Sequence, residues 1–140
     1  MLGPADAAVI ARVVPDVFDH APDARWTAEF LNDSRHHIAV AIDAGSVVGI
    51  ASAVHYVHPD KAPELWINEV GVATAHRGRG IGRRLVHAVL QHGRELGCAS
   101  AWVLADQSNA PAHRLYEAAG GEPAPELSVM FNFRLTDGPR

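Results

Sequence analysis

The sequence contains little of what several protein classes require. Cys98 is the only cysteine, which excludes a disulfide framework and a zinc site built from cysteines. No apolar run approaches the roughly 20 residues that span a bilayer, and the first residues lack the basic start of a signal peptide. Hydrophobic residues make up 48% of the chain and charged residues 20%, which excludes wholesale disorder. We expect one cytoplasmic domain over residues 1–140, with 135–140 as a loose tail.

Acidic residues are absent from one segment. The whole chain has 12 Lys+Arg and 16 Asp+Glu, a net charge of −4. Residues 70–94 contain five arginines and no Asp or Glu, which leaves seven basic and sixteen acidic residues elsewhere, a net charge of −9. A basic island in an otherwise acidic chain favours a compact anion as ligand over nucleic acid. The acidic remainder favours a small cationic partner, and no membrane partner is expected.

The hydrophobic pattern predicts an α/β (α+β) fold, with helices packed on a central mixed, mostly antiparallel sheet. The predicted helices are about 4–20 (starting at Pro4 and interrupted or kinked at Pro15), 27–32 (capped by Thr27), 82–96 and 109–119. The predicted strands are 36–42, 47–57, 64–72, 99–105 and an alternating segment at 128–135. A hairpin turn is predicted at 43–46.

The most informative segment joins the strand that ends at Val72 to the following helix. Its glycines let the backbone bend tightly and approach a ligand. The helix start offers unpaired N–H groups to a phosphate, and arginines add charge-assisted contacts. The glycine spacing of a Rossmann fold and the Gly-Lys-Ser/Thr of a P-loop are both absent. The pattern that is present is Arg77-x-x-Gly80-x-Gly82.

This pattern resembles the acyl-CoA-binding signature of the GNAT family of N-acetyltransferases. A second match, Asn109-x-x-Ala112-x-x-Leu115-Tyr116-x-x-x-Gly120, follows at the family's distance. The resemblance covers about 36–135 and implies a single GNAT-like domain that uses acetyl-CoA. The family opens with a β-strand for which residues 1–4 leave almost no room. We therefore expect that first strand to be missing, shortened or supplied by a neighbouring chain.

The resemblance also implies which residues hold the cofactor. Main-chain groups of Val70 and Val72 would lie against the pantetheine and the thioester. Asn109 would contact CoA or cap its helix, and the two roles are compatible. The residues implied for the pyrophosphate are Arg77, Gly78, Arg79, Gly80, Ile81, Gly82 and Arg83.

Acetyl transfer to an amine needs a general base, because an alkyl amine with a pKa near 10 is mostly protonated at pH 7. Glu69 is the candidate, acting directly or through a water, and in a regular strand it shares a face with Gly71. The alternative is a carboxylate that only attracts a cationic substrate or pairs with an arginine. Tyr116 lies where the family has its general acid for the CoA sulfur, and its alternative role is packing beneath the sheet.

Histidine and cysteine spacing gives no metal site. His36-His37 and His55-x-x-His58 are expected to be structural or solvated histidines, and no metal is predicted. Cys98 is expected to be a small core residue, with a Cys–His acyl-enzyme as the sharper alternative.

The chain is similar in further detail to GNAT-type aminoglycoside 3-N-acetyltransferases, through Tyr56-Val57-x-Pro59 and the stretch from Ala105-Asp106 to Tyr116. That resemblance implies a small cationic acceptor acetylated on a 3-amino group, with Asp106 and Tyr56 as contacts. The group's polar residues after Val129-Met130 are replaced by Phe131 and Phe133. The alternatives are acetylation of a protein, peptide or other small amine, and a non-catalytic CoA-binding module. The apolar last strand is compatible with a homodimer.

Overall fold

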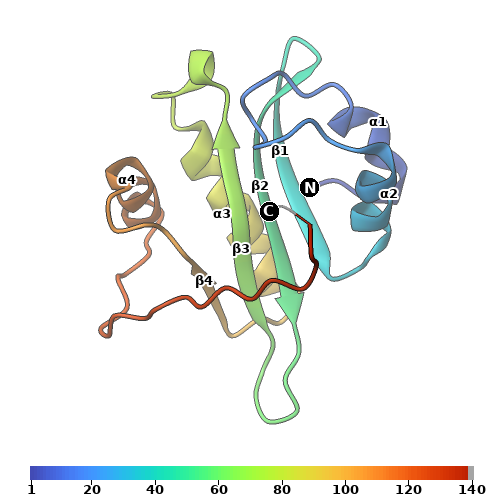
Figure 1. Ribbon diagram of the computed structural model, residues 1–140. Coiled ribbons are helices and arrows are strands. Elements are labelled where there is room, and N and C mark those ends of the chain that lie inside the picture. Colours follow the sequence, from blue (N-terminus) through green and yellow to red (C-terminus); the bar gives the residue numbers. More distant parts are fainter. Residues whose placement is uncertain (139–140) are drawn as a thin grey trace.

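The computed structural model describes residues 1–138, and its helices and strands follow the predicted order over most of the chain (Figure 1). The N-terminal part contains η1 (Pro4–Asp6), α1 (Ala7–Ile10) and α2 (Ala24–Asn32). The remaining elements are β1 (His36–Asp43), β2 (Ser46–Tyr56), β3 (Glu64–Val72), η2 (Thr74–His76), α3 (Ile81–Glu95), β4 (Ser100–Val103) and α4 (Ala110–Ala118).

The strands form one sheet in the order β1-β2-β3-β4. The β1–β2 and β2–β3 pairs are antiparallel and the β3–β4 pair is parallel, so the predicted mixed, mostly antiparallel sheet is confirmed. The predicted hairpin turn is also confirmed. Ala44 and Gly45 both have positive φ, 49° and 80°, the conformation that suits a tight turn between twisted antiparallel strands.

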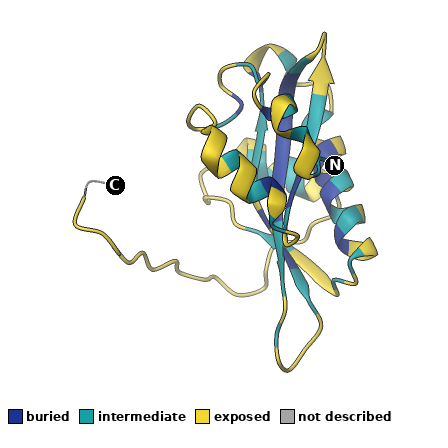
Figure 2. Ribbon diagram, turned by 90° about the vertical axis from the view of Figure 1, so that its right-hand side faces the viewer, coloured by how far each residue is buried: buried dark blue, intermediate teal, exposed yellow. Residues whose placement is uncertain are grey.

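The sheet separates two apolar clusters. Val48 and Ile50 of β2 face the N-terminal helices and pack with Ile10 and Leu31. Ala51 and Ala53 face α3 in a second cluster, whose other buried members include Leu65, Ile67, Leu85, Val86 and Val89. Figure 2 shows the buried residues concentrated along the strands and on the inner sides of the helices. The alternation along β2 therefore assigns each side chain of the sheet to one of the two faces.

Strand β3 has an irregularity that matters for the site. Glu69 pairs with Ser52 and Ile67 pairs with Ala53, so Asn68 is an extra residue in a β-bulge. The β3–β4 pairing ends at Ile67↔Val103, whereas β3 continues to Val72. Among the described residues, the last five positions of β3 therefore have no strand beside them on the β4 side.

The N-terminal prediction is wrong in two respects. Instead of one helix over 4–20, only two short turns form, and residues 11–23 are irregular. The reason lies in tertiary contacts, since Val13 makes a parallel bridge to Val47 and Asp16 adopts a left-handed φ of 66°. Helix α2 begins earlier than predicted, at Ala24, because Asp23 rather than Thr27 caps it: Asp23 Oδ1 accepts from the Trp26 N–H at 3.0 Å.

The last predicted strand is also wrong. Residues 128–135 form neither strand nor helix, and they are exposed throughout. Their alternation needs a partner strand to become a β-strand, and none lies beside them within residues 1–138. Of the predicted tail, residues 135–138 are exposed and irregular, and 139–140 lie outside the described residues.

Residues 1–35 contain no strand, only an isolated bridge from Val13 to Val47. The N-terminal segment makes only isolated backbone bonds to the sheet: the Leu2 N–H donates to the Ile38 carbonyl at 3.0 Å along the outer edge of β1, and the residues on either side of Val13 bond to Val47.

Candidate active site

The glycine loop leads into a helix start that has no side-chain cap. Gly78 and Gly80 have φ values of 76° and 77°, a left-handed region that side chains other than glycine rarely adopt. Gly80 begins α3 without any side-chain cap, so the first N–H groups of the helix have no partner in the helix. The loop thus presents unpaired backbone donors at the positive end of a fifteen-residue helix.

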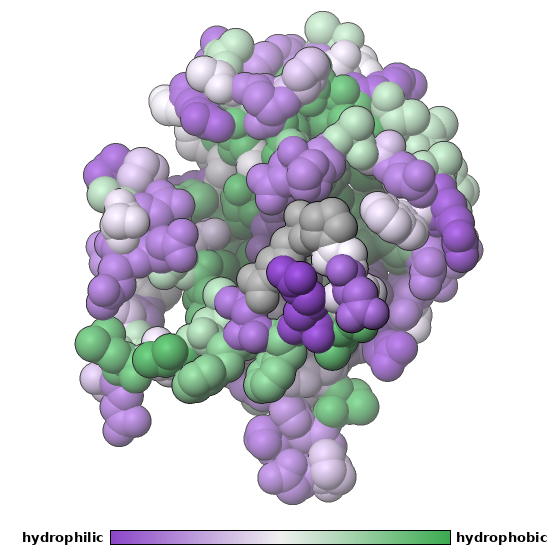
Figure 3. Space-filling model, viewed as in Figure 1, coloured by the Kyte–Doolittle hydropathy of each residue, from purple (hydrophilic) through white to green (hydrophobic). Residues whose placement is uncertain are grey.

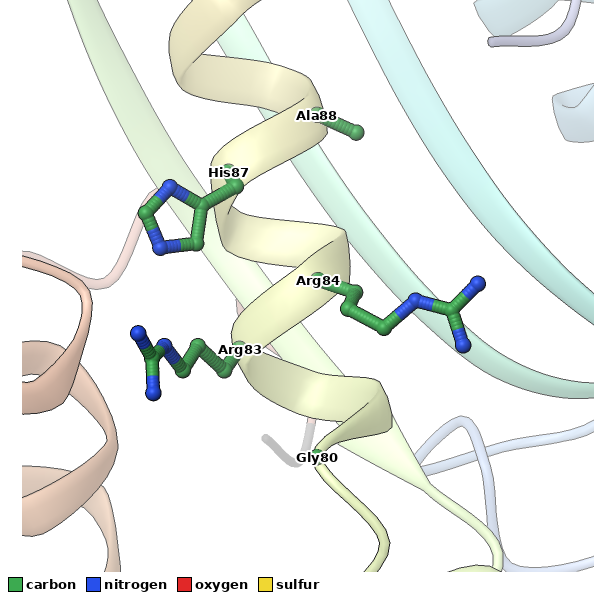
Figure 4. A pocket seen from close by; sticks show the side chains of 5 residues that line it. All are labelled: Gly80, Arg83, Arg84, His87 and Ala88. Atoms are coloured by element: carbon green, nitrogen blue, oxygen red, sulfur yellow. The ribbon is translucent and has the colours of Figure 1, made fainter.

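Arginines surround this helix start (Figure 4). Arg83 and His87 point toward α4, whereas Arg84 points to the opposite side, and with Gly80 and Ala88 they line an open depression. Arg77 turns back on the strand, where its Nε donates to the Val72 carbonyl at 3.0 Å. Arg79 donates to the Ala75 carbonyl at 3.3 Å. Of the predicted pyrophosphate residues, Gly80, Ile81, Gly82 and Arg83 thus form the start of α3, whereas Gly78 lies in the loop and Arg77 and Arg79 bond to backbone carbonyls before it.

The backbone of Val70 and Val72 lies at the open edge of β3. The Ala73 N–H donates to the Val48 carbonyl of β2 at 2.8 Å. Because backbone groups alternate between the two edges of a strand, those of Val70 and Val72 point away from β2, toward the side that β4 leaves open. The bond from Arg77 to the Val72 carbonyl agrees with this direction. A fixed N–H at such an edge can polarise a carbonyl oxygen.

Glu69 lies beside this edge on the face of the N-terminal segment. Burial raises the pKa of Glu69 above its usual value, and the Asp19 carboxylate acts in the same direction. The Asp19 backbone N–H and His20 act in the opposite direction. The charged side chains that face Glu69 are therefore an acid and a histidine, not an arginine. A carboxylate with a raised pKa is a better base near neutral pH.

A short segment, Asp16–His20, covers this part of β3. The Asp16 carboxylate accepts from both the N–H and the hydroxyl of Thr74, and these bonds lower the pKa of Asp16. A Cβ on Gly71 would lie 2.1 Å from the Val17 carbonyl oxygen, so only glycine permits this close approach. The Asp16–His20 segment, which faces Glu69, is thus hydrogen-bonded through Asp16 to Thr74, just before the glycine loop.

Tyr116 and Asn109 lie on α4, on the other side of the sheet. Tyr116 packs against the same apolar cluster of α3 and the sheet as Val70 and Val72, and burial raises the pKa of its phenol. Asn109 caps the helix, since its Oδ1 accepts from the Ala112 N–H at 3.1 Å. Val70 and Val72 thus lie between Glu69 on one face of the sheet and Tyr116 on the other.

A model of the acetyltransferase (GNAT) family matches residues 9–120, most of the chain. The chain belongs to the GNAT family. It is 35% identical over 118 residues to streptothricin acetyltransferase of Streptomyces lavendulae, covering 84% of this chain and 59% of that protein. It is 33% identical over 111 residues to mycothiol acetyltransferase of Thermomonospora curvata, covering 73% of this chain and 35% of that one. The chain thus spans about three fifths and about a third of these relatives.

Solved structures show the same GNAT fold. An aminoglycoside acetyltransferase from an uncultured soil metagenomic sample, crystallised with sisomicin, superposes with a TM-score of 0.81 at 23% identity. The match covers 96% of this chain and 93% of that one. Ribosomal-protein-alanine N-acetyltransferase of Brucella melitensis gives a TM-score of 0.72 at 22% identity, with 94% and 96% coverage. The predicted GNAT-like fold is confirmed.

The two predicted acceptor residues are not brought together. Asp106 is exposed and lies three residues beyond β4, where its backbone carbonyl accepts from His113 Nε2 at 2.9 Å. Tyr56 is on the same face of the sheet as Glu69 but at the far end of β2. It pairs with Glu64, and its hydroxyl accepts from Trp102 Nε1 at 2.8 Å. The pairing positions place Tyr56 four residues along β2 from Ser52, about 14 Å from the level of Glu69.

Sequence reasoning missed two parts of this GNAT domain. The Asp16–Thr74 contact joins residues 58 positions apart and has no local signal. The sequence suggested the pairs His36-His37 and His55-x-x-His58, whereas in the structure His37 lies between His55 at 2.7 Å and His92 at 3.0 Å. Among residues 1–138, no group of three or more His, Cys, Asp and Glu side chains is arranged to hold a metal ion. No helix in that range is long and apolar enough to span a bilayer. Cys98 is partly buried, and burial raises the pKa of its thiol.

Proposed function

We propose that this GNAT domain is an N-acetyltransferase that moves an acetyl group from acetyl-CoA directly to a primary amine. The observation that supports this most strongly is the open edge of β3 at Val70 and Val72, with Glu69 on one face and Tyr116 on the other. A purely CoA-binding module needs neither of these two side chains. We also propose that the protein acts in the cytoplasm, as the sequence leads us to expect.

Each group has one role in this reaction. The helix start and the arginines from Arg77 to Arg83 hold the pyrophosphate, with Asn109 beside them. Glu69 takes a proton from the acceptor ammonium, so that the amine nitrogen can form its bond to the thioester carbon. The Val70 or Val72 N–H polarises the carbonyl oxygen, and Tyr116 donates its phenol proton to the sulfur as the carbon–sulfur bond breaks. The nitrogen, which is positively charged once it has bonded to the carbon, then releases its second proton to the Tyr116 phenolate and becomes the neutral amide.

The acceptor we propose is a small cationic amine, with an aminoglycoside 3-amino group as the leading candidate. The supporting observations are the net charge of −9 outside residues 70–94, the Asp19 and Glu69 carboxylates at one place, and Asp106 exposed after β4. The relatives include a streptothricin acetyltransferase, and the structural neighbours include an aminoglycoside acetyltransferase crystallised with sisomicin. Tyr56 would contact only an acceptor long enough to extend along the sheet face from Glu69.

Thiol release from acetyl-CoA tests the proposal. Wild-type protein is assayed with sisomicin, streptothricin, spermidine and short peptides. Glu69→Gln and Tyr116→Phe should each lower kcat/KM about 10²- to 10⁴-fold for the accepted amine. Glu95→Gln and Glu117→Gln, exposed carboxylates on α3 and α4, are the matched controls and should leave the rate unchanged.

The pH profile separates the two roles considered for Glu69. A base with a raised pKa gives an acidic limb in kcat/KM above the ordinary glutamate value, and Glu69→Gln abolishes this limb. A carboxylate that only attracts the substrate leaves the limb in place and raises KM. Unchanged rates in both variants would overturn the catalytic proposal, and CoA binding by calorimetry without turnover of any amine would favour the binding module.

A further inference from the structure

Two tryptophans on neighbouring strands form a stacked pair beside the candidate active site. Trp66 of β3 and Trp102 of β4 are register partners, and their ring centroids lie 5.0 Å apart with an angle of 12° between the ring planes. Leu65 and Ile67, the neighbours of Trp66 along β3, pack into the cluster on the α3 side. Because side chains alternate along a strand, Trp66 points to the opposite face, the face of Glu69 and the N-terminal segment.

Trp66 lies between two carboxylates on this face. Its partner on β2 and the partner of Glu69 are two positions apart, which corresponds to about 7 Å along the strand. On the other side of Trp66, Glu64 has a β2 partner that is again two positions away. The face of β3 thus presents an acid, an indole and an acid in sequence.

The indole of Trp66 is held in place and remains accessible. Trp102 Nε1 donates to the Tyr56 hydroxyl at 2.8 Å, which fixes the plane of the ring that stacks on Trp66. Trp66 itself is 37% exposed. Because Trp102 covers the side of this ring toward β4, the ring face turned away from β4 is left for a ligand. Figure 3 looks onto this side of the sheet, on which hydrophilic and hydrophobic residues are mixed.

The carboxylate beyond the indole keeps its charge. His58 Nε2 lies 2.6 Å from Glu64 Oε2, and the Ser100 hydroxyl donates to Glu64 Oε1 at 3.1 Å. The bond from His58, followed by that from Ser100, lowers the pKa of Glu64. Glu64 is therefore ionised at neutral pH and contributes a negative potential beside Trp66.

An indole between two carboxylates suits a cation. The face of an aromatic ring is electron-rich and attracts an ammonium group within about 6 Å of its centroid, and tryptophan does so most strongly. The acids on both sides add to this attraction and oppose the approach of an anion. An ammonium group on Trp66 would lie about 7 Å from an amine at Glu69, which is within one small molecule.

We propose that Trp66 binds a second ammonium group of the acceptor, about 7 Å from the amine that Glu69 deprotonates. Trp102 and Tyr56 are positioning residues that hold the Trp66 ring. The acceptor is then a diamine or polyamine with this spacing between two of its nitrogens, on a linear chain or on linked rings. The inference rests on the role proposed above for Glu69.

Thiol release from acetyl-CoA with α,ω-diaminoalkanes of three to eight carbons tests the spacing. The value of kcat/KM should be highest at about five carbons, where the span of the two nitrogens matches the strand spacing of about 7 Å. The matched acceptor is 5-amino-1-pentanol, which has a hydroxyl in place of the second ammonium group. Its kcat/KM should be about 3- to 30-fold lower than that of 1,5-diaminopentane, mainly through a higher KM.

Variants of Trp66 separate the aromatic ring from the carboxylates. Trp66→Leu keeps an apolar side chain without a ring, and it should reduce the preference for the diamine over the amino alcohol about 3- to 30-fold, through KM. Trp66→Phe keeps a smaller ring and should give an intermediate preference. Val57→Ala removes an exposed apolar side chain just beyond β2 and should leave the preference unchanged. Equal CoA affinity in calorimetry shows that each variant is folded.

Two results would overturn the proposal. One is an equal preference for the diamine in wild-type protein and Trp66→Leu, because the carboxylates alone would then select the second ammonium group. The other is a monoamine or peptide that is turned over better than every diamine. If Trp66→Leu loses CoA binding, the same comparison is made between wild-type protein and Trp66→Phe.

Failure of the acetyltransferase function itself gives a different result, in which no amine is turned over. Calorimetry of 1,5-diaminopentane with the CoA-bound protein then decides the role of Trp66. Binding that is weaker in Trp66→Leu supports the indole site, whereas binding that is equal to wild type, or no binding to either protein, refutes it.

Discussion

The acid sensitivity of folding should depend on His37. This side chain is 7% exposed and lies between His55 and His92, on the α3 side of the sheet. Burial, together with the like charges that His92 and His55 carry when protonated, lowers the pKa of His37 from 6.5 to about 4. His36 acts in the same direction and Asp33 opposes it. The folded protein thus keeps His37 neutral over a pH range in which the unfolded chain protonates it.

The sign and size of the pH effect on stability follow from this difference in the pKa of His37 between the folded and unfolded states. Between pH 6.5 and pH 4 the unfolded state binds more protons than the folded state, so the free energy of unfolding falls as the pH is lowered. The free energy of unfolding is not reduced by this effect above about pH 6.5, where His37 is mostly neutral in both the folded and the unfolded state. With a folded pKa of about 4, the loss between pH 7 and pH 5 is about 2 kcal/mol, and below pH 4 it approaches about 3 kcal/mol.

Urea denaturation followed by tryptophan fluorescence measures the free energy of unfolding at pH 7 and pH 5. The wild-type free energy of unfolding should fall by about 2 kcal/mol more than that of His37→Asn over this interval, because the variant has no imidazole to protonate. His87→Asn is the control, since His87 is exposed on α3 and should leave the wild-type slope unchanged. A His37→Asn variant with the wild-type pH slope would refute the reasoning.

Three further substitutions test the site. Gly71→Ala forces a Cβ against the Val17 carbonyl and should cost about 1–3 kcal/mol in urea denaturation, so a neutral result would contradict the close approach. Arg77→Ala should weaken CoA binding about 10-fold by calorimetry and reduce its salt dependence; equal salt slopes would remove Arg77 from the anion site. Thr74→Val removes one bond to Asp16 and should cost about 1 kcal/mol, whereas Thr74→Ser, which keeps the hydroxyl, should be near neutral.

Much of the site was readable from the sequence because its determinants are local. Glycines at 78 and 80 predict a loop with left-handed φ angles, and the helix start after them, which has no side-chain cap, indicates unpaired backbone donors. Asn109 marks the start of α4 in the same local way, since its side chain bonds to a backbone group three residues on. Hydrophobic periodicity then fixed strands β1 to β3 to within a residue or two.

The predictions failed where distant residues compete with local preference. Residues 11–23 have apolar residues enough for a helix, but Val13 pairs with Val47 and Asp16 bonds to Thr74, and both contacts require an irregular backbone. Residues 128–135 have the alternation of a strand, but a strand needs a neighbour for its backbone groups, and none lies beside them among residues 1–138.

Local patterns in the chain were therefore enough to predict the glycine loop, the helix that follows it, the alternating faces of the sheet and the family. These depend on φ angles, caps and periodicity, which act over a few residues. Only the tertiary structure decided that Asp16–His20 covers Glu69, that β3 and β4 part after Ile67, and that three histidines meet. Those features arise from packing between segments far apart in the chain, and no local pattern encodes them.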